Sequence, residues 1–565
     1  MVNVKNLFGM AVMATALVGC SSNDNLAPDG KDNVGKTGEA YASFTINLPT
    51  TRATRATDGE PAFAEGDAKE YEVKNGTILI FTNDGKFVTS AQLGNMNPWK
   101  DIKTDGVTTA ATATVQLSGV QVGGSYKALV LLNNDVDAST SKVKLPLAGE
   151  SYADWNANAA NATAAYTKTD YIFMANAPKY TGTKTEPTTL VPVANICASR
   201  EQAEAKAATT VYVERGLAKV TMQKFNADGY AIAAGTYKGD KVEIKAWQLD
   251  VTNKSTFPVH QTSSLTDGFA NIWSTPRFYD ETSTAFKRVY WGVDPNYNDA
   301  KYLVLDNCKE AFNMITEVKG LAGEENPQYC LENTFDLANM MQGQTTRVVF
   351  KAVYSPKTFS PNETFYKVAN NTAVWHENDL KTQIKTLALQ AMGITTTAEQ
   401  EKYDVKLDAT TNDISGKAGQ HIIKTDNITF SDATGTYTSK INDDVVKTVN
   451  EKLGLSEDPT THKVIVGIST YLNGEAYYIA RIKHFNELTP WTAGTPYNGD
   501  NNAFLGRYGV LRNNWYDLSV NSISGLGYPD VPEVKPTVPD DENEQFINVE
   551  VKILDWAKRS QNIDL

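Results

Sequence analysis

The chain has 565 residues, of which 41% are hydrophobic and 10% aromatic. This is enough apolar material for a packed core and indicates two or more domains. The net charge of -13 argues against nucleic acid as a partner, because binding to phosphates requires a basic face. The 26 tyrosines, together with many threonine, valine and isoleucine residues, favour β-strands.

The first twenty residues, MVNVKNLFGMAVMATALVGC, have the pattern of a lipoprotein export signal. Lys5 is their only charge, and the apolar run from Leu7 to Val18 is too short to cross a bilayer. Cys20 directly follows small residues at the expected cleavage site. We therefore expect residues 1–19 to be removed and Cys20 to carry lipid such as palmitate, as the only attachment to the membrane. The alternative is an ordinary export signal with a chance cysteine.

A strand with one apolar face precedes a short arginine tandem. Residues 40–49 alternate apolar and polar side chains, which predicts a half-buried strand. Its apolar face carries Ala42, Phe44, Ile46 and Leu48. Arg52 and Arg55 follow in TTRATRAT, an exposed context that suits an Arg-specific protease. We prefer Arg55 as the cut site, because a turn-rich entry to the globular part begins after it; the alternative is that both arginines only solvate a linker.

Most of the remaining chain has the alternation of antiparallel β-strands. Hairpin turns are predicted at Asn83-Asp84-Gly85 and at Asn473-Gly474. A long alternating strand over residues 209–225 is a natural crossing point between two domains. Helical patterns interrupt the strands at residues 199–207, where Ser199 is expected to cap the helix, and at residues 377–393 and 442–454.

These elements predict a mainly β fold with two sandwich-like domains. We place the propeptide with its first strand at residues 20–55, the N-terminal domain at 56–212, and the C-terminal domain with its helical insertion at 213–530. Residues 531–565 hold a linker rich in proline and acidic residues, followed by a last strand.

The last strand, residues 546–556, is cleanly alternating and has no neighbouring hairpin partner in the sequence. Its apolar positions are Ile547, Val549, Val551 and Ile553. The chain thus has one apolar strand near each end, and the two strands have the same pattern. We infer that they compete for one site.

The sequence offers no catalytic or metal-binding motif. Its five histidines lack HExxH spacing, and no phosphate-binding glycine motif is present. We expect no enzyme activity, no cofactor and no metal. Cys197, Cys308 and Cys330 remain after lipidation, which leaves open one disulfide or three buried thiols.

Two other functions compete with a structural role. An anchored lipoprotein that binds glycans would need an aromatic platform. The candidates for such a platform are Trp291, Trp375, Trp491 and Trp515. An envelope hydrolase is the weakest alternative, because no constellation of residues supports it.

The arginine tandem and the two strands together suggest strand exchange. A cut after Arg55 or Arg52 removes the tether of the first strand, so that this strand can leave its groove. The strand from residues 546–556 of another molecule then enters the open groove. Repetition of this head-to-tail contact without closure produces a filament.

The chain resembles the major shaft subunit of short (minor) fimbriae, of the type V pilus class found in Bacteroidales. The resemblance is strongest in VYVERGLAKV (211–220), YCLENTF (329–335), GRYGVLRNNWYDLSVNSISGLGYP (506–529) and INVEVKILDWAKRSQNIDL (547–565). It implies two transthyretin-like β-sandwich domains and a lipoprotein precursor that is cut by an Arg-specific protease.

The resemblance also assigns roles to residues. Cys20 corresponds to the lipid site and Arg55, or Arg52, to the processing site. Residues 42–48 correspond to the expelled strand, and 547–553 to the donor strand. The implied partners are further copies of the chain in a head-to-tail homopolymer, accessory anchor and tip subunits, and the protease. The implied location is a cell-surface fimbrium that supports adhesion and biofilm formation, with the precursor held at the outer membrane.

Overall fold

The computed structural model describes residues 39–49, 63–64, 68–94, 100–104, 107–134, 143–158, 171–180, 187–262, 287–319, 326–401, 403–407, 419–425, 428–432, 442–484, 504–540 and 547–556. Cys20, Arg52, Arg55 and Trp491 lie outside these ranges, and the predictions made for them are therefore not addressed by the structure. Within the described ranges, no helix is both long and apolar enough to cross a membrane.

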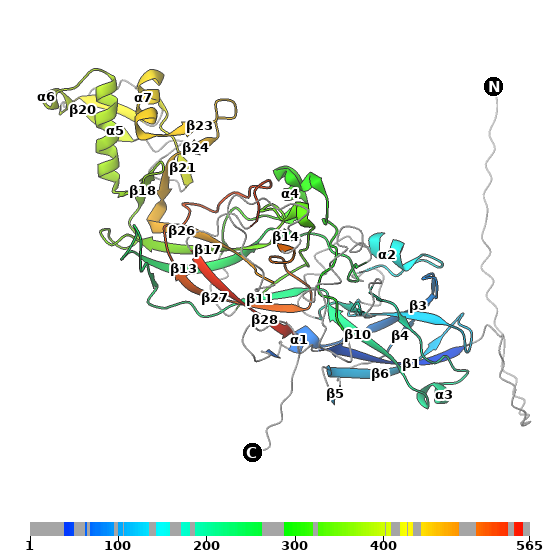
Figure 1. Ribbon diagram of the computed structural model, residues 1–565. Coiled ribbons are helices and arrows are strands. Elements are labelled where there is room, and N and C mark those ends of the chain that lie inside the picture. The colour runs from blue at the N-terminus through cyan, green and yellow to red at the C-terminus, as the bar shows by residue number, and fades with distance from the viewer. Residues whose placement is uncertain are drawn as a thin grey trace, which may run out of the picture.

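The fold is mainly β, as predicted, and falls into three parts that follow one another across Figure 1. The first part is one nine-stranded sheet. Its strand order is β4 (Phe87–Gln92), β3 (Gly76–Thr82), β7 (Tyr126–Leu132), β8 (Met174–Asn176), β10 (Thr209–Arg215), β1 (Ala40–Pro49), β6 (Val107–Leu117) and β5 (Lys100–Thr104), with β9 (Val191–Pro192) beside β7.

Strand alternation builds the core of this first part. Ile78 and Ile80 of β3 share one cluster of buried side chains with Phe44 and Ile46 of β1. The two halves of the sheet therefore face one another, which is the arrangement of a β-sandwich. The predicted turn between β3 and β4 is present, and Gly85 has a φ of 80°, which a glycine adopts without strain.

The second part consists of two larger sheets and a short strand pair. One sheet has the order β16 (Gln328–Cys330), β11 (Ala218–Met222), β27 (Asn514–Ile523), β28 (Ile547–Trp556) and β2 (Phe63–Ala64). The other sheet has the order β12 (Tyr230–Ala231), β13 (Lys241–Asp250), β17 (Arg347–Ser355) and β26 (Glu475–Arg481), and β14 (Thr252–Asn253) pairs with β15 (Phe312–Asn313). Trp247, Phe350 and Leu518 are buried in one core cluster that draws on both larger sheets.

The chain crosses from the first part to the second where we predicted it, within residues 209–225. The predicted single strand is, however, broken into β10 and β11 at Gly216 and Leu217. β10 belongs to the first sheet and β11 to the second part. The break lets one continuous stretch of chain serve two sheets.

The third part is the predicted helical insertion, and it projects away from the two sandwiches at the upper left of Figure 1. Its four-stranded sheet has the order β19 (Val374–Trp375), β18 (Phe365–Val368), β25 (Ile468–Tyr471) and β21 (Gly419–His421), accompanied by the pairs β20 (Tyr403–Leu407) with β22 (Ile428–Asp432) and β23 (Ser456–Glu457) with β24 (Val464–Val466). Its helices are α5 (Glu377–Ala391), α6 (Thr397–Gln400) and α7 (Asp443–Leu453). Leu380 and Ile384 of α5 pack in one cluster with Val449 of α7.

Polar side chains cap the start of some of the helices. The remaining helices are α1 (Ala68–Tyr71), α2 (Tyr152–Asn158), α3 (Arg200–Glu204), α4 (Leu305–Ala311), η3 (Ala300–Leu303), η4 (Leu337–Asn339) and η6 (Leu472–Gly474). The hydroxyl of Ser199 accepts a hydrogen bond from the backbone of Gln202, which confirms the predicted serine cap of α3. Asn442 caps α7 in the same way, and Gly454 ends that helix in a left-handed conformation.

The hairpin predicted at Asn473-Gly474 is wrong. Both residues have positive φ angles, so the turn itself is present. The strands on its two sides belong to different sheets, because β25 pairs with β18 and β21, whereas β26 pairs with β17. The turn at Asn473-Gly474 therefore connects the projecting third part to the second sandwich.

Candidate functional site

The first terminal strand, β1, occupies an interior position of its sheet. It runs parallel to β10, with Phe44 opposite Thr209, and antiparallel to β6, from Ala40 opposite Leu117 to Pro49 opposite Val107. Every side chain on its apolar face has 0% exposure. These are the predicted Ala42, Phe44, Ile46 and Leu48, together with Ala40, which the sequence analysis did not include.

The opposite face of β1 is covered more completely than we predicted for a half-buried strand. Ser43 and Asn47 are also buried. The hydroxyl of Ser43 donates to the backbone oxygen of Ala203 in α3, at 3.0 Å, and lies 2.8 Å from the hydroxyl of Thr114. β1 is therefore held by two strand neighbours, a core face and a covering helix.

The second terminal strand, β28, is paired on one side with β27 of its own chain. The antiparallel register runs from Asn514 opposite Asp555 to Ile523 opposite Ile547. The prediction that this strand lacks a hairpin partner is therefore wrong. The partner was missed because 23 residues, 524–546, separate the two strands in the sequence.

The other side of β28 is nearly uncovered. Among the described residues, only β2 pairs there, through Phe63 opposite Asp555 and Ala64 opposite Trp556. Val549 is 8% exposed and contributes to the core of the second sandwich. The backbones of Ile547, Val551 and Ile553 lie opposite Ile523, Leu518 and Tyr516, respectively.

The segment before β28 differs from the linker we predicted. Residues 528–540, which we call the strap, lie against the second sandwich through backbone pairing, buried side chains and hydrogen bonds. Val534 is 5% exposed and Asp540 is completely buried. The proline-rich composition predicted an extended linker, and it carried no information on whether that segment docks.

Buried charges that the sequence analysis missed join the first and second parts of the molecule. Glu214, at the end of β10, bonds Arg288 at 2.9 Å and the Nδ1 atom of His260 at 3.0 Å. Glu332 bonds Arg512 at 2.9 Å. Burial alone would raise the pKa of Glu214, but Arg288 and His260 hold it below its ordinary value. This pairing of buried charges is typical of a structural junction.

A further buried carboxylate lies in the same region. Asp294 accepts hydrogen bonds from the side chain of Asn253 at 2.7 Å, and from the backbones of Thr334 at 2.9 Å and Asn296 at 2.7 Å. Burial raises the pKa of Asp294 to about 7. Among the described residues, no group of three or more His, Cys, Asp or Glu side chains is placed to hold a metal ion.

The three cysteines are free, buried thiols, which resolves the alternative left open above. Cys308 donates to the backbone oxygen of Tyr302 at 2.8 Å. Trp291, one of the tryptophans proposed for a sugar platform, is a core residue with 0% exposure. Trp515 is half-buried and its ring lies under the ammonium group of Lys219, at 3.8 Å from the centroid.

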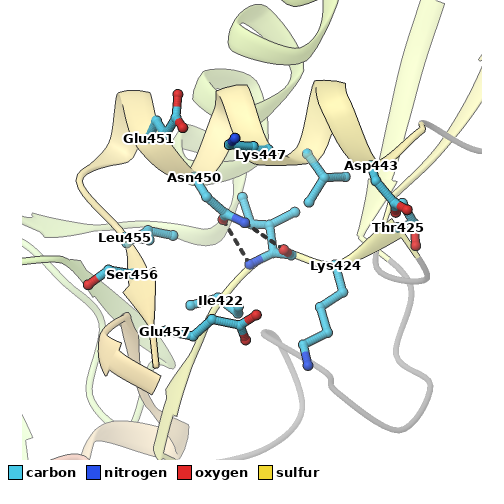
Figure 2. A pocket seen from close by; sticks show the side chains of 12 residues that line it. Ile422, Lys424, Thr425, Asp443, Lys447, Asn450, Glu451, Leu455, Ser456 and Glu457 are labelled. Carbon is cyan, nitrogen blue, oxygen red and sulfur yellow. Dashed lines mark hydrogen bonds between the residues drawn. The ribbon is translucent and has the colours of Figure 1, made fainter. Parts of the chain in front are cut away.

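The projecting third part contains a cleft of about 510 Å³ between α7 and the segment after β21. Figure 2 shows Asn450 of α7 holding the backbone of Ile423 through two hydrogen bonds, of 2.8 and 3.1 Å. Ile422 and Leu455 supply apolar surface, and charged side chains such as Lys447 line the rim. No lining residue in this described region is aromatic, so the cleft does not offer the ring platform that a glycan-binding function would use.

Comparison with known proteins gives one match by sequence family. Residues 469–562 match the family model described as major fimbrial subunit protein type IV, fimbrillin, C-terminal. The matched segment contains β26, β27, the strap and β28. No curated protein matches the chain.

Several solved structures are similar in architecture. A candidate cell adhesion protein from Parabacteroides distasonis has 9% identity and a TM-score of 0.39, and the match covers 92% of this chain and 99% of that protein. A candidate cell adhesion protein from Bacteroides eggerthii has 12% identity and a TM-score of 0.32, with 93% and 98% covered. A C-terminally truncated tip fimbrial protein from Porphyromonas gingivalis has 11% identity and a TM-score of 0.27, with 91% and 100% covered.

At such low TM-scores and identities, these structural similarities support no conclusion about the function of this chain. The family match is the informative finding, because it falls on the segment that carries β27, the strap and β28. The resemblance inferred from the sequence is thereby supported in the C-terminal part of the chain, where residues 469–562 are similar to the C-terminal segment of the fimbrillin-type major fimbrial subunits.

Proposed function

We propose that the protein is a structural shaft subunit of a bacterial fimbria. In this proposal it is exported as a lipoprotein precursor with lipid on Cys20 and is cut by an Arg-specific protease after Arg55 or Arg52. The subunits polymerise when β28 of one copy replaces β1 of the next. The observation that supports this best is that β1 lies in a sheet interior with its whole apolar face buried, yet it is continuous with the arginine tandem just beyond it.

Removal of β1 would leave an open groove between β10 and β6. Both strands would lose a hydrogen-bonded neighbour, and such unpaired edges readily accept another strand. The groove would also lose Phe44, Ile46 and Leu48, which have 0% exposure. Burial of three such side chains contributes roughly 5–9 kcal/mol before the ordering costs of the chain are subtracted. A replacing strand with the same alternation of apolar residues recovers this free energy of burial.

The donor strand must first leave its own sheet. β28 has a full-length neighbour on one side and a two-residue neighbour, β2, on the other. In the groove it would have a neighbour on both sides, as β1 has. Each additional ladder hydrogen bond contributes about 0.5–1.5 kcal/mol net. The second ladder therefore favours transfer to the neighbouring subunit over return to β27.

This function places the protein at the cell surface, where it works by assembly and not by catalysis. Its partners are further copies of itself, accessory anchor and tip subunits, and the protease that starts assembly. Adhesion and biofilm formation follow from the filament. The precursor is held at the outer membrane through its lipid alone.

The test is a truncation that removes residues 546–565 from the full-length precursor. After treatment with an Arg-specific protease, we expect a folded monomer without filaments under the electron microscope, whereas the intact chain forms them. The circular dichroism of the truncated chain controls for folding. Normal filaments from the truncated chain would show that β28 is not the donor.

A further inference from the structure

The connection between β27 and β28 is much longer than their pairing requires. Ile523 and Ile547 lie directly opposite one another, yet residues 524–546 lie between them in the chain. A β-hairpin needs only about 2–5 loop residues, and long connections are usually functional. The connection is thus 23 residues long, although the two strand ends that it joins are paired with one another.

The strap begins its contacts at β26. Tyr528 exchanges two backbone hydrogen bonds with Tyr477, each of 2.8 Å. Further along, the guanidinium group of Arg347 donates to the backbone oxygen of Pro532 at 2.6 Å. The same guanidinium group donates to Asp250 at 2.8 Å, so it is fixed independently of the strap.

The middle of the strap packs against apolar side chains and against the backbone of Gly343. Val534 shares a buried cluster with Cys308 and Phe312. Pro536 lies so close to Gly343 that a Cβ atom added there would be 3.0 Å from the Cα atom of Pro536. This close approach is possible because Gly343 has no side chain.

The strap ends in three hydrogen bonds. The backbone of Gln342 donates to the oxygen of Val538 at 2.9 Å, and the backbone of Asp540 donates to Met340 at 3.1 Å. The hydroxyl of Thr345 donates to the carboxylate of Asp540 at 2.9 Å. Among the described residues, the strap contacts Lys463 of the third part, β17, β26, residues 302–345 and the apolar cluster that includes Ala246 of β13, and none of its contacts is made to β28.

We propose that the strap stays docked when β28 is transferred, and that it anchors the donor strand on the body of its own subunit. This inference rests on the proposed function, and the partner is a second copy of this chain. Because the strap contacts do not involve β28, departure of β28 leaves them in place. In the sequence, residues 541–546 then separate the anchor at Asp540 from the donor strand.

The anchor limits where the next subunit can be. A chain spans at most about 3.3–3.6 Å per residue, so β28 starts within about 24 Å of Asp540. With the strap released, free chain would begin after Gly527, and the reach would rise to about 70 Å. A docked strap therefore gives a short connection and a defined spacing between subunits, whereas a released strap gives a long and flexible one.

The experiment measures hydrogen exchange by mass spectrometry in the full-length precursor and in filaments made from it with an Arg-specific protease. The probe is the peptide that covers residues 528–540. Val534→Asp places a charge at a site with 5% exposure and should release the strap. Thr537→Asp is the matched control, because it adds the same charge at an exposed strap position.

We expect strap protection in the wild type to agree within about twofold between monomer and filament. Val534→Asp should lower that protection at least about tenfold and broaden the spacing of subunits in electron micrographs, whereas Thr537→Asp should do neither. Should Val534→Asp fail to fold, the wild-type comparison still decides the question.

Two results would overturn the inference, and they differ in whether the proposed function stands. If wild-type filaments form but the strap loses its protection in them, the strap is not the anchor, while the proposed assembly by strand exchange stands. If processed wild-type protein forms no filaments, the proposed function fails, and the inference about the strap fails with it.

Discussion

The two terminal strands of this protein have the same alternating pattern but are held in opposite ways. β1 has a strand on each side and all of its apolar face buried, whereas β28 has a full partner only in β27. The chain beyond β1 contains the arginine tandem, whereas the chain before β28 is docked through the strap. Under the proposed function, β1 is paired on both sides but can be cut from its subunit, whereas β28 has a full ladder on one side and stays connected to its subunit through the strap.

This difference gives assembly a direction. In strand exchange, the strand that leaves a subunit must first be cut from that subunit. The strand that is donated must stay covalently linked to its own subunit. Cleavage near β1 and an anchor before β28 meet both requirements on one chain. The four predictions below test this contrast, beginning with the largest expected effect.

The largest effect is expected at the arginine tandem. Changing both Arg52 and Arg55 to Lys keeps the positive charges but removes the Arg-specific target. We expect an uncut precursor that keeps β1 and forms no filaments, as judged by mass spectrometry and electron microscopy. Each single Arg→Lys variant identifies which bond is cut. Filaments built from uncut double-variant chains would contradict the contrast between the two strands.

The next effect concerns Phe44 of β1. Phe44→Ala should lower the free energy of unfolding of the precursor by about 3–5 kcal/mol, because it removes a large side chain with 0% exposure. The processed subunit in filaments should be unaffected, because β1 is gone. Denaturant unfolding of both forms measures the difference. Equal destabilisation of precursor and filament would mean that β1 remains in the mature protein.

Asp294 belongs to neither strand and so serves as a reference for both forms. Its pKa of about 7 lies above the ordinary value of 3.8, because burial favours the neutral acid. The folded protein therefore binds an extra proton between these values, and its stability falls as the pH rises from about 4 to 7. The slope is at most about 1.4 kcal/mol per pH unit.

Asp294→Asn should flatten this slope equally in precursor and processed protein, measured by denaturant unfolding across the same pH range. An unchanged slope in the variant would assign the pH dependence to other groups. A slope that changes in only one of the two forms would mean that this region reorganises when β1 leaves.

The smallest effect is expected at Val549 of β28. Val549→Ala removes two methyl groups from a site with 8% exposure and should cost the unprocessed monomer about 1–2 kcal/mol. Unlike Phe44→Ala, it should weaken filaments as well, because β28 persists in them. Thermal unfolding of the monomer and dissociation of filaments in denaturant check both expectations. An effect on the monomer alone would place Val549 outside the assembled interface.

Local pattern was sufficient to predict β1, the existence of the strand β28, the serine cap of α3 and the insertion helices α5 and α7. In each case the signal is a periodicity or a cap within about ten to fifteen residues. The crossing between the sandwiches was also predictable, although its break at Gly216 was not.

Features that depend on distant residues were not predictable in this way. The pairing of β28 with β27 spans a 23-residue connection, and the buried bonds of Glu214 reach Arg288 and His260 from far along the chain. The Asn473-Gly474 turn was identified correctly, but its flanking strands find partners in other sheets. Docking of the strap depends on Gly343 and Thr345, which nothing in the proline-rich sequence itself specifies.

The central claim, that β28 replaces β1 in the next subunit, is tested most directly by a cryo-electron microscopy reconstruction of the processed filament. The account predicts a strand with the sequence of residues 547–556 between β10 and β6 of the adjacent subunit, with β1 absent from that groove. A reconstruction in which β28 remains beside its own β27 while β1 still fills the groove would contradict it.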